Sequence, residues 1–200
     1  MRRRGRADEA RDGVRSLLRS MGEDPRRPAL KATPGRVVRA FSELTDEGGV
    51  ALAELLDAAL FEERAEDLVL VRGIEFYSLC EHHLLPFFGR CHVAYLPAGR
   101  LIGFSRIPRL VDHFARRLQV QERLTRQIAD ALDTSLKPRG VACIVEALHL
   151  CMAMRGVRKQ QAAAVTTAYR GLFRREPARR AEIAALLRSE GGAGPLSPSS

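Results

Sequence analysis

Two residues with metal-binding side chains, Cys80 and His83, lie three positions apart in the chain. This spacing lets a thiolate and an imidazole reach one ion from a single turn, and zinc prefers this pair of ligands. A structural zinc site needs four protein ligands, usually from two paired clusters, and the sequence has no second pair of this kind. A catalytic site needs only three, because water takes the fourth position. The spacing therefore favours a catalytic zinc site; the alternative is a chance pairing with a packed, hydrogen-bonded His83.

Cys151 is the best candidate for the third ligand. We expect a strand over 141–154, and residues of equal parity on a strand share a face. His149, Cys151 and Arg155 would then point the same way. One face would offer a thiolate, a titratable imidazole and a fixed positive charge.

The neighbouring histidine and the other cysteines are expected to have different roles. His82 could act on a substrate while the adjacent His83 binds the ion. Cys91 and Cys143 lie within apolar strand runs, and we expect both to be small buried side chains.

Two further polar stretches could bind a nucleotide. Ser105, Arg106 and Arg109 lie at a predicted strand-to-helix junction, where backbone N–H groups and arginines can bind phosphate. Gln121 and Glu122 open a predicted helix, and a carboxylate beside an amide could read the donor edge of a purine there. The alternative for Glu122 is a favourable charge at a helix N-terminus. The residues by themselves leave both interpretations open.

The composition is that of an ordinary globular protein. Of the 200 residues, 46% are hydrophobic and 28% are charged, which argues against wholesale disorder. The longest apolar runs are far shorter than the roughly 20 residues that cross a bilayer, and the N-terminus does not resemble a signal peptide. We therefore expect a cytoplasmic protein without membrane contact, whose four cysteines are thiols or ligands.

The formal net charge of +9 fits phosphorylated substrates, nucleic acid or anionic lipid. The alternative explanation of this charge is that most arginines lie on solvated helix faces and bind no partner. No basic stretch carries the interleaved aromatic residues that single-stranded nucleic acid prefers. We therefore expect no nucleic-acid partner.

These residues must be positioned by helices and strands. Helical periodicity predicts helices at 14–21, 33–44, 50–60, 108–117, 120–136 and 181–187. Strand patterns occur at 68–72, 75–79, 91–96, 101–104, 141–154 and 165–173. Residues 101–104 are expected to return as the hairpin partner of 91–96. This order favours an α+β fold with a largely antiparallel sheet, divided into an N-terminal helical region (1–66), a catalytic domain (67–190) and a disordered tail (191–200).

Four segments, in the correct order, resemble the GTP cyclohydrolase I family. They are TPGRVVRAF at 33–41, CEHHLLPFFG at 80–89, IGFSRIPRLVDHFARRLQVQERLTRQI at 102–128 and EALHLCMAMRGV at 146–157. The resemblance covers roughly residues 10–188. It implies a tunnelling fold, in which antiparallel sheets of several subunits close into a β-barrel. Two five-membered rings would stack into a homodecamer, with active sites shared between subunits.

The resemblance also implies the chemistry. Cys80, His83 and Cys151 would bind Zn2+, and the water activated there would attack C8 of GTP. His82 would protonate the guanine ring at N7, and His149 would move protons at the attacked carbon. Release of formate, rearrangement of the ribose and closure of a new ring would give 7,8-dihydroneopterin triphosphate.

The other site residues implied by the resemblance surround the nucleotide. Ser105 and Gln121 match residues near the ribose and base, and they join the two histidines in the catalytic set. Glu122 matches the carboxylate that holds the guanine N1–H and amino group. The basic set around the triphosphate would consist of Arg36, Arg39, Arg106, Arg109 and Arg155.

The chain departs from the family pattern at a few positions. Arg106 stands where lysine is usual, and its planar fork does not simply replace an ammonium group. Ala162 and Ala164 stand where Ser and Thr are common, and each lost hydroxyl could remove a hydrogen bond worth about 1 kcal/mol. Two other functions are considered: a purine-nucleotide hydrolase that stops at a formamidopyrimidine or ring-opened product, and a non-catalytic, zinc-stabilised binding protein.

Overall fold

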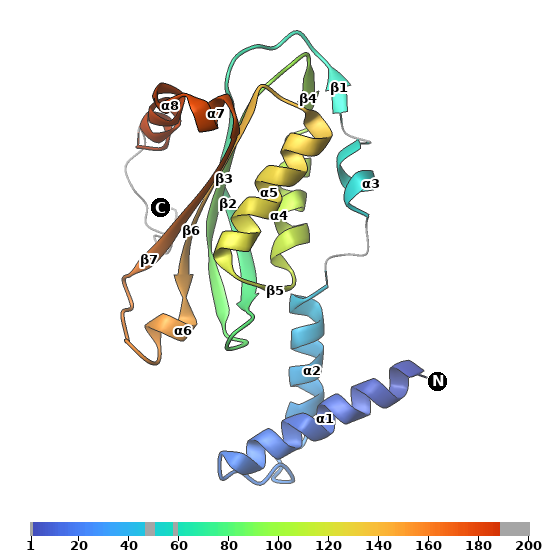
Figure 1. The fold of residues 1–200 in the computed structure, drawn as a ribbon. Coiled ribbons are helices and arrows are strands. Elements are labelled where there is room, and N and C mark those ends of the chain that lie inside the picture. Colours follow the sequence, from blue (N-terminus) through green and yellow to red (C-terminus); the bar gives the residue numbers. More distant parts are fainter. Residues whose placement is uncertain (1, 47–50, 58–59, 189–200) are drawn as a thin grey trace. The chain divides into compact units, whose positions relative to one another are not determined.

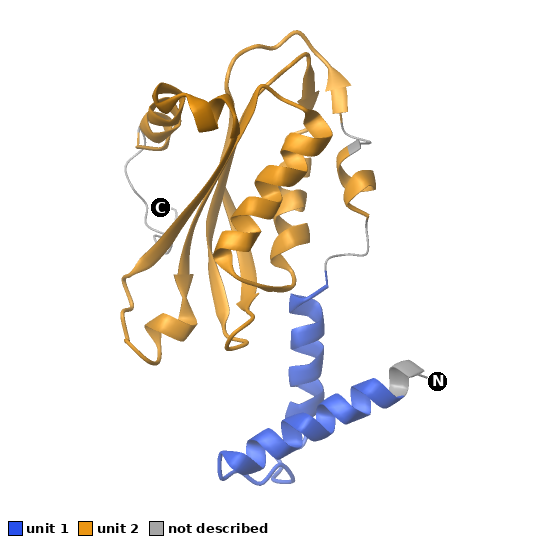
Figure 2. Cartoon of the chain, viewed as in Figure 1, with its two compact units in different colours: residues 1–46 blue, residues 47–200 orange. Residues whose placement is uncertain are grey.

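The computed structural model describes residues 2–46, 51–57 and 60–188 (Figure 1). The chain divides into two compact units, residues 1–46 and 47–200 (Figure 2). Helix α3 (Leu52–Asp57) and strand β1 (Leu60–Glu62) therefore belong to the second unit. The boundary predicted at residue 66, between an N-terminal helical region and a catalytic domain, stays a prediction. The predicted disordered tail at 191–200 lies outside the described residues.

The first unit is a pair of contacting helices, α1 (Arg2–Ser20) and α2 (Thr33–Leu44). The helices predicted at 14–21 and 33–44 are confirmed, but α1 begins further upstream. Its polar first half carries oppositely charged side chains three positions apart, which stabilise a helix without an apolar face. These ion pairs are Arg11 with Asp8 and Arg15 with Asp12.

The second unit is built on a five-stranded sheet of order β5-β2-β3-β6-β7. Its strands are β2 (Val69–Cys80), β3 (Pro86–Leu96), β5 (Leu118–Gln119), β6 (Gly140–His149) and β7 (Ala163–Gly171). Only the short β5 pairs in parallel, and the other neighbours are antiparallel. Helices α4 (Arg106–Ala115) and α5 (Gln121–Leu136) cover one face (Figure 1). The predicted α+β class with a largely antiparallel sheet is confirmed.

The core of this unit lies between the sheet and helices α4 and α5. Alternate residues of β3 face this core. Cys91 and Cys143 are both fully buried, so their predicted burial is confirmed. Strands β3 and β6 approach each other closely at Gly89. A Cβ atom there would overlap the carbonyl oxygen of Glu146. Only glycine therefore fits at this position.

The predicted hairpin between 91–96 and 101–104 is wrong. Strand β4 (Arg100–Ile102) pairs instead with β1 in a separate two-stranded sheet. The physical reason is that β2 and β6 occupy both edges of β3, so β3 has no edge left for β4. The helix predicted at 50–60 is too long as well, because Leu60 lies in β1; residues 47–50 and 58–59 lie outside the described residues.

The strand predicted at 141–154 is too long. Strand β6 ends at His149, and the chain continues as the one-turn helix α6 (Leu150–Ala153). His149 pairs with Phe87, next to Pro86, where β3 begins. Proline lacks the N–H group that would extend the ladder. Cys151 therefore lies on a helix and does not share a strand face with His149. The one-turn helix α7 (Leu172–Arg175) and the longer helix α8 (Pro177–Arg188) follow β7.

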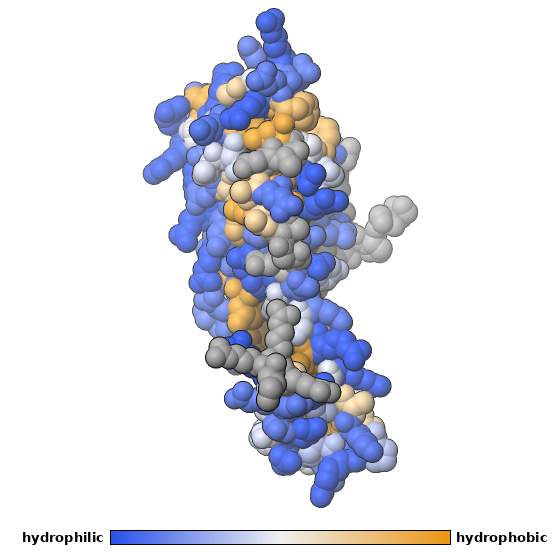
Figure 3. Space-filling model, turned by 90° about the vertical axis from the view of Figure 1, so that its right-hand side faces the viewer, coloured by the Kyte–Doolittle hydropathy of each residue, from blue (hydrophilic) through white to orange (hydrophobic). Residues whose placement is uncertain are grey.

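Hydrophilic side chains dominate the face seen in Figure 3, where apolar side chains form only small patches. Among the described residues, no helix is both long and apolar enough to cross a membrane.

Candidate metal centre and its surroundings

Cys80, His83 and Cys151 come together in the second unit. Their potential ligand atoms all lie within 4.8 Å of one another, and Cys80 Sγ is 3.8 Å from His83 Nδ1. Cys80 is buried at the end of β2, Cys151 is half-buried in α6, and His83 is exposed. The three residues chosen from the sequence thus form one group, although a helix rather than a strand presents Cys151.

The turn between β2 and β3 places the first two of these side chains. The N–H groups of His83 and Leu84 both donate to the carbonyl oxygen of Cys80, at 3.3 and 2.8 Å, and the Cys80 N–H donates to Leu85 O at 2.9 Å. Leu84 has a φ of 55°, in a region that non-glycine residues rarely adopt. This tight turn folds His83 back towards Cys80.

The chemistry of the group suits a zinc ion. Burial raises the pKa of the Cys151 thiol, and the nearby Cys80 raises it further. A divalent cation has the opposite effect, because it stabilises both thiolates at once. Two thiolates and an imidazole match the ligand preference of zinc, and three protein ligands leave one tetrahedral position for water or substrate. The residues present therefore fit the metal expected from the sequence.

His149, the last residue of β6, is held by two contacts. Its Nε2 lies 2.7 Å from Gln121 Oε1. Its ring stacks on Phe87, with centroids 4.7 Å apart and an interplanar angle of 4°. Burial lowers the pKa of His149, although the charge of Glu122 opposes this shift. The environment therefore favours the neutral imidazole in a fixed orientation.

Gln121 is buried at the first position of α5, and protein groups surround its amide. Its Nε2 donates to the carbonyl oxygens of Val145, at 3.0 Å, and Ala164, at 2.9 Å. It also lies 3.1 Å from Thr166 Oγ1. Gln121 thus connects α5 to β6, β7 and His149. The sequence did not single out Thr166, because nothing in its local pattern shows that β7 faces this amide.

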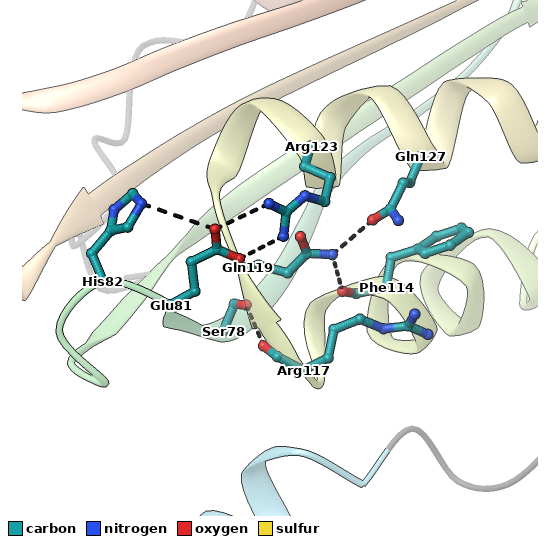
Figure 4. Close-up of polar contacts among 8 residues, drawn as sticks. All are labelled: Ser78, Glu81, His82, Phe114, Arg117, Gln119, Arg123 and Gln127. Atoms are coloured by element: carbon teal, nitrogen blue, oxygen red, sulfur yellow. Dashed lines mark hydrogen bonds and ion pairs between the residues drawn. The ribbon is translucent and has the colours of Figure 1, made fainter.

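A second connection joins the metal-binding turn to α5 (Figure 4). Both Nη atoms of Arg123 bond the carboxylate of Glu81, Nη1 to Oε2 at 2.6 Å and Nη2 to Oε1 at 3.0 Å. These bonds lower the pKa of Glu81. His82 is largely exposed, and its Nε2 lies 3.9 Å from Glu81 Oε1. This ion pair was not predicted from the sequence, where its only signal is opposite charge beside two predicted site segments.

Strand β5 supports the same turn. The Glu81 N–H donates to Gln119 O at 3.0 Å. The buried Gln119 side chain donates through Nε2 to Phe114 O and to Gln127 Oε1, both at 2.8 Å (Figure 4). The connection between α4 and α5 is therefore fixed to the end of β2.

Ser105, Arg106 and Arg109 lie at the start of α4, directly after the β4 segment, so their predicted strand-to-helix junction is confirmed. The other end of α4 is the one beside the metal group, because Ser78 Oγ donates to Ala115 O at 2.7 Å. A helix of 10 residues spans about 15 Å. Within the described residues of one chain, Ser105 and Arg106 are therefore not brought to the metal group, and Arg109 lies about one helical turn closer to it.

The remaining predicted site residues are exposed. Arg36 and Arg39 lie on α2 in the first unit, one helical turn apart. Glu122 lies in the first turn of α5, and Arg155 lies just beyond α6, four positions after Cys151.

The fold and the Cys-His-Cys group define an α+β protein whose metal site suits a catalytic rather than a structural ion. The family model for GTP cyclohydrolase I matches residues 10–188. A GTP cyclohydrolase 1 from Methylococcus capsulatus is 53% identical over 86% of this chain and 92% of its own length. Relatives of the same name from Leptospira biflexa (52% identical; 88% of this chain, 96% of the relative) and Deinococcus radiodurans (51% identical; 85% and 79%) are equally similar. The chain belongs to the GTP cyclohydrolase I family.

Proposed function

We propose that this protein is a GTP cyclohydrolase. It hydrolyses GTP at C8, releases formate, and after rearrangement and ring closure yields 7,8-dihydroneopterin triphosphate. The observation that carries this proposal is the meeting of Cys80, His83 and Cys151 within 4.8 Å in a chain about half identical to relatives named for this activity. We expect it to act in the cytoplasm, which keeps such thiols reduced.

Cys80, His83 and Cys151 would hold the zinc ion. When bound, zinc supplies Lewis acidity and lowers the pKa of water towards about 7. The three side chains come from two separate segments of the chain, so the site forms only when β2 and β6 lie in one sheet.

His149 acts as the base at the attacked carbon. Its ring is fixed by Gln121 and Phe87, and its lowered pKa favours the neutral form that can accept a proton. His82 has the opposite task, to deliver a proton to N7 of the guanine ring. Its exposed side chain, on the same turn as Cys80 and His83, supports this role, because it is free to reach a substrate at the metal group.

Glu122 binds the guanine edge. Its carboxylate would accept hydrogen bonds from N1–H and the exocyclic amino group, which are the donors that distinguish guanine from adenine. This role is supported by the exposure of Glu122, whereas the side chains of its neighbours Gln121 and Arg123 both bond to protein groups.

The ribose and triphosphate are bound by Ser105 and the arginines, and a second copy of the chain completes each site. Ser105 and Arg106 are about a helix length from the metal group of their own chain, so they, together with Arg109 one turn along the same helix, would serve a neighbouring copy. Strand β7 also ends the sheet, which gives an edge for pairing between copies. Both features support the tunnelling-fold barrel and the homodecamer, with Arg155, Arg36 and Arg39 adding positive charge for the triphosphate.

The test is incubation of zinc-loaded protein with GTP, followed by analysis of the products by mass. Formate and, after oxidation, a fluorescent pterin are expected, and Cys151→Ala should give neither. Absence of formate would overturn the proposal. Formate without a pterin, or an uncleaved formyl group, would identify instead a hydrolase that stops at an earlier product.

A further inference from the structure

We infer that Arg123 and Glu81 are a positioning pair, which sets the geometry of the metal group by holding the turn of residues 80–85 against helix α5. This inference rests on the proposed zinc site. It concerns two residues that neither bind the ion nor touch the substrate in the mechanism above.

Few contacts anchor this turn to the rest of the fold, and the ion pair is one of them. It carries Cys80, His82 and His83, and half of its six side chains are exposed. Its backbone bonds are local, apart from the bond of the Glu81 N–H to β5. The Glu81 side chain provides a further, more distant anchor, through two bonds to one guanidinium group.

The geometry of the pair is what gives it a positioning role. Exposed ion pairs usually contribute little to stability. A bidentate arginine–carboxylate pair, however, fixes orientation as well as distance, because its two parallel bonds resist rotation. Arg123 and Glu81 have this arrangement, at 2.6 and 3.0 Å.

Two residues of the first turn of α5 connect it to different parts of the site, with one exposed residue between them. Gln121 bonds to β6, β7 and His149, Glu122 is exposed, and Arg123 bonds to the metal-binding turn. Successive helix residues point about 100° apart, which allows one rigid turn of helix to reach both parts of the site. The spacing between the Cys80–His83 turn and the segment that carries Cys151 is therefore set by α5.

Residues that orient metal ligands without binding the ion typically change metal affinity by 10- to 100-fold when they are replaced. We expect a loss of about 10-fold in zinc affinity for Arg123→Gln and for Glu81→Gln. Arg123→Lys keeps the charge but not the fork, so its affinity should lie between those of the wild type and Arg123→Gln. The double variant should be no weaker than the weaker single variant, because each change breaks the same contact.

The experiment measures zinc affinity by competition with a chromophoric chelator, and in parallel the thermal unfolding of the metal-free full-length proteins. Arg126→Gln is the matched control: Arg126 is exposed on the same helix, three positions further on, and its affinity should equal that of the wild type. If the pair has a positioning role, the variants should bind zinc more weakly, while their unfolding temperatures without metal stay within a few degrees of that of the wild type. If Arg123→Gln does not fold, Arg123→Lys and Glu81→Gln carry the test.

Two results would overturn the inference in distinguishable ways. If Glu81→Gln and the Arg123 variants bind zinc as tightly as the wild type, the pair has no positioning role, and the zinc site itself stands. If the wild type binds no zinc, the proposed metal site fails together with the inference.

Discussion

His149 Nε2 donates a hydrogen bond to Gln121 Oε1 across 2.7 Å, and the rest of the glutamine amide fixes the direction of this bond. Gln121 Nε2 faces the carbonyl oxygens of Val145 and Ala164, which can only accept. Oε1 is therefore the atom that faces the histidine. Neutral His149 must carry its proton on Nε2, which leaves Nδ1 as the basic nitrogen.

Replacement of Gln121 by methionine, which has a similar length but no amide, should lower kcat at least 10-fold with little change in the KM for GTP. The physical reason is that His149 loses the acceptor that selects its tautomer. The carbonyl oxygens of Val145 and Ala164 also lose their donor, which should destabilise the fold by about 1–3 kcal/mol. Steady-state kinetics and thermal unfolding measure the two effects. A raised KM at unchanged kcat would show that Gln121 binds substrate instead.

Removal of the third ligand should abolish metal binding. Cys151→Ala is expected to elute from gel filtration without zinc, because two ligands from one turn hold the ion poorly. Cys91→Ala is the control, since Cys91 is fully buried in the core, and it should retain the metal content of the wild type. Zinc is measured by elemental analysis of the eluted protein. Full zinc content in Cys151→Ala would exclude this cysteine as a ligand.

Gly89→Ala should be strongly destabilising. A Cβ at this position overlaps the carbonyl oxygen of Glu146, so β3 and β6 would have to separate, at a cost of roughly 3 kcal/mol or more. Gly103→Ala is the matched control, because a Cβ there meets nothing within 4 Å. Chemical denaturation of both variants tests the difference, and equal free energies of unfolding would contradict it.

The stability of the fold should fall as the pH drops below about 6.5, partly because of His92. Burial, followed by the charges of Arg90 and Arg72, lowers the pKa of His92 below its usual 6.5, and its Nδ1 accepts a bond from the Gly73 N–H at 3.2 Å. Below the unfolded-state pKa the unfolded chain binds a proton that the folded chain does not, so stability is lost as pH falls. His92→Gln should flatten this dependence in thermal unfolding scans; an unchanged slope would argue against it.

Activity should be restored by mixing two inactive chains. Co-expression of Cys151→Ala with Arg109→Ala would give mixed oligomers in which some sites combine an intact metal group from one chain with an intact Arg109 from the other. Formate release that exceeds the sum of the separately purified variants is expected. If mixed oligomers, verified by two affinity tags, remain as inactive as their parents, then each site is built from a single chain.

Local patterns in the sequence were sufficient for the helices that cover the sheet and for most of the strands. Cys80 and His83 could be chosen from residue type and spacing, because they lie in one turn, whereas Cys151 was chosen for a strand face that the structure does not have. The pairing of β4 with β1 could not be predicted, since alternation shows that a segment is a strand and not which partner it takes. The end of β6 at His149 could not be predicted either, because it depends on Pro86, which lies in a different strand.

The side-chain network around α5 was also beyond local inference. Arg123 reaches Glu81 across 42 positions, and Gln121 reaches Ala164 across 43. Such contacts depend on tertiary structure and leave no periodic signal in one sequence. The family resemblance implied that Gln121 lies near the base and ribose, but nothing in the sequence indicated its bonds to β6, β7 and His149.

The position of the metal group along the chain has a consequence for folding. Two of its ligands precede α4 and α5 and the third follows them, so an ion held by all three would act as a reversible cross-link around both core helices. Closing so long a loop reduces the conformational entropy of the unfolded chain, and an ion that binds only the folded form raises stability by mass action. Chelation would therefore weaken the fold as well as stop the reaction.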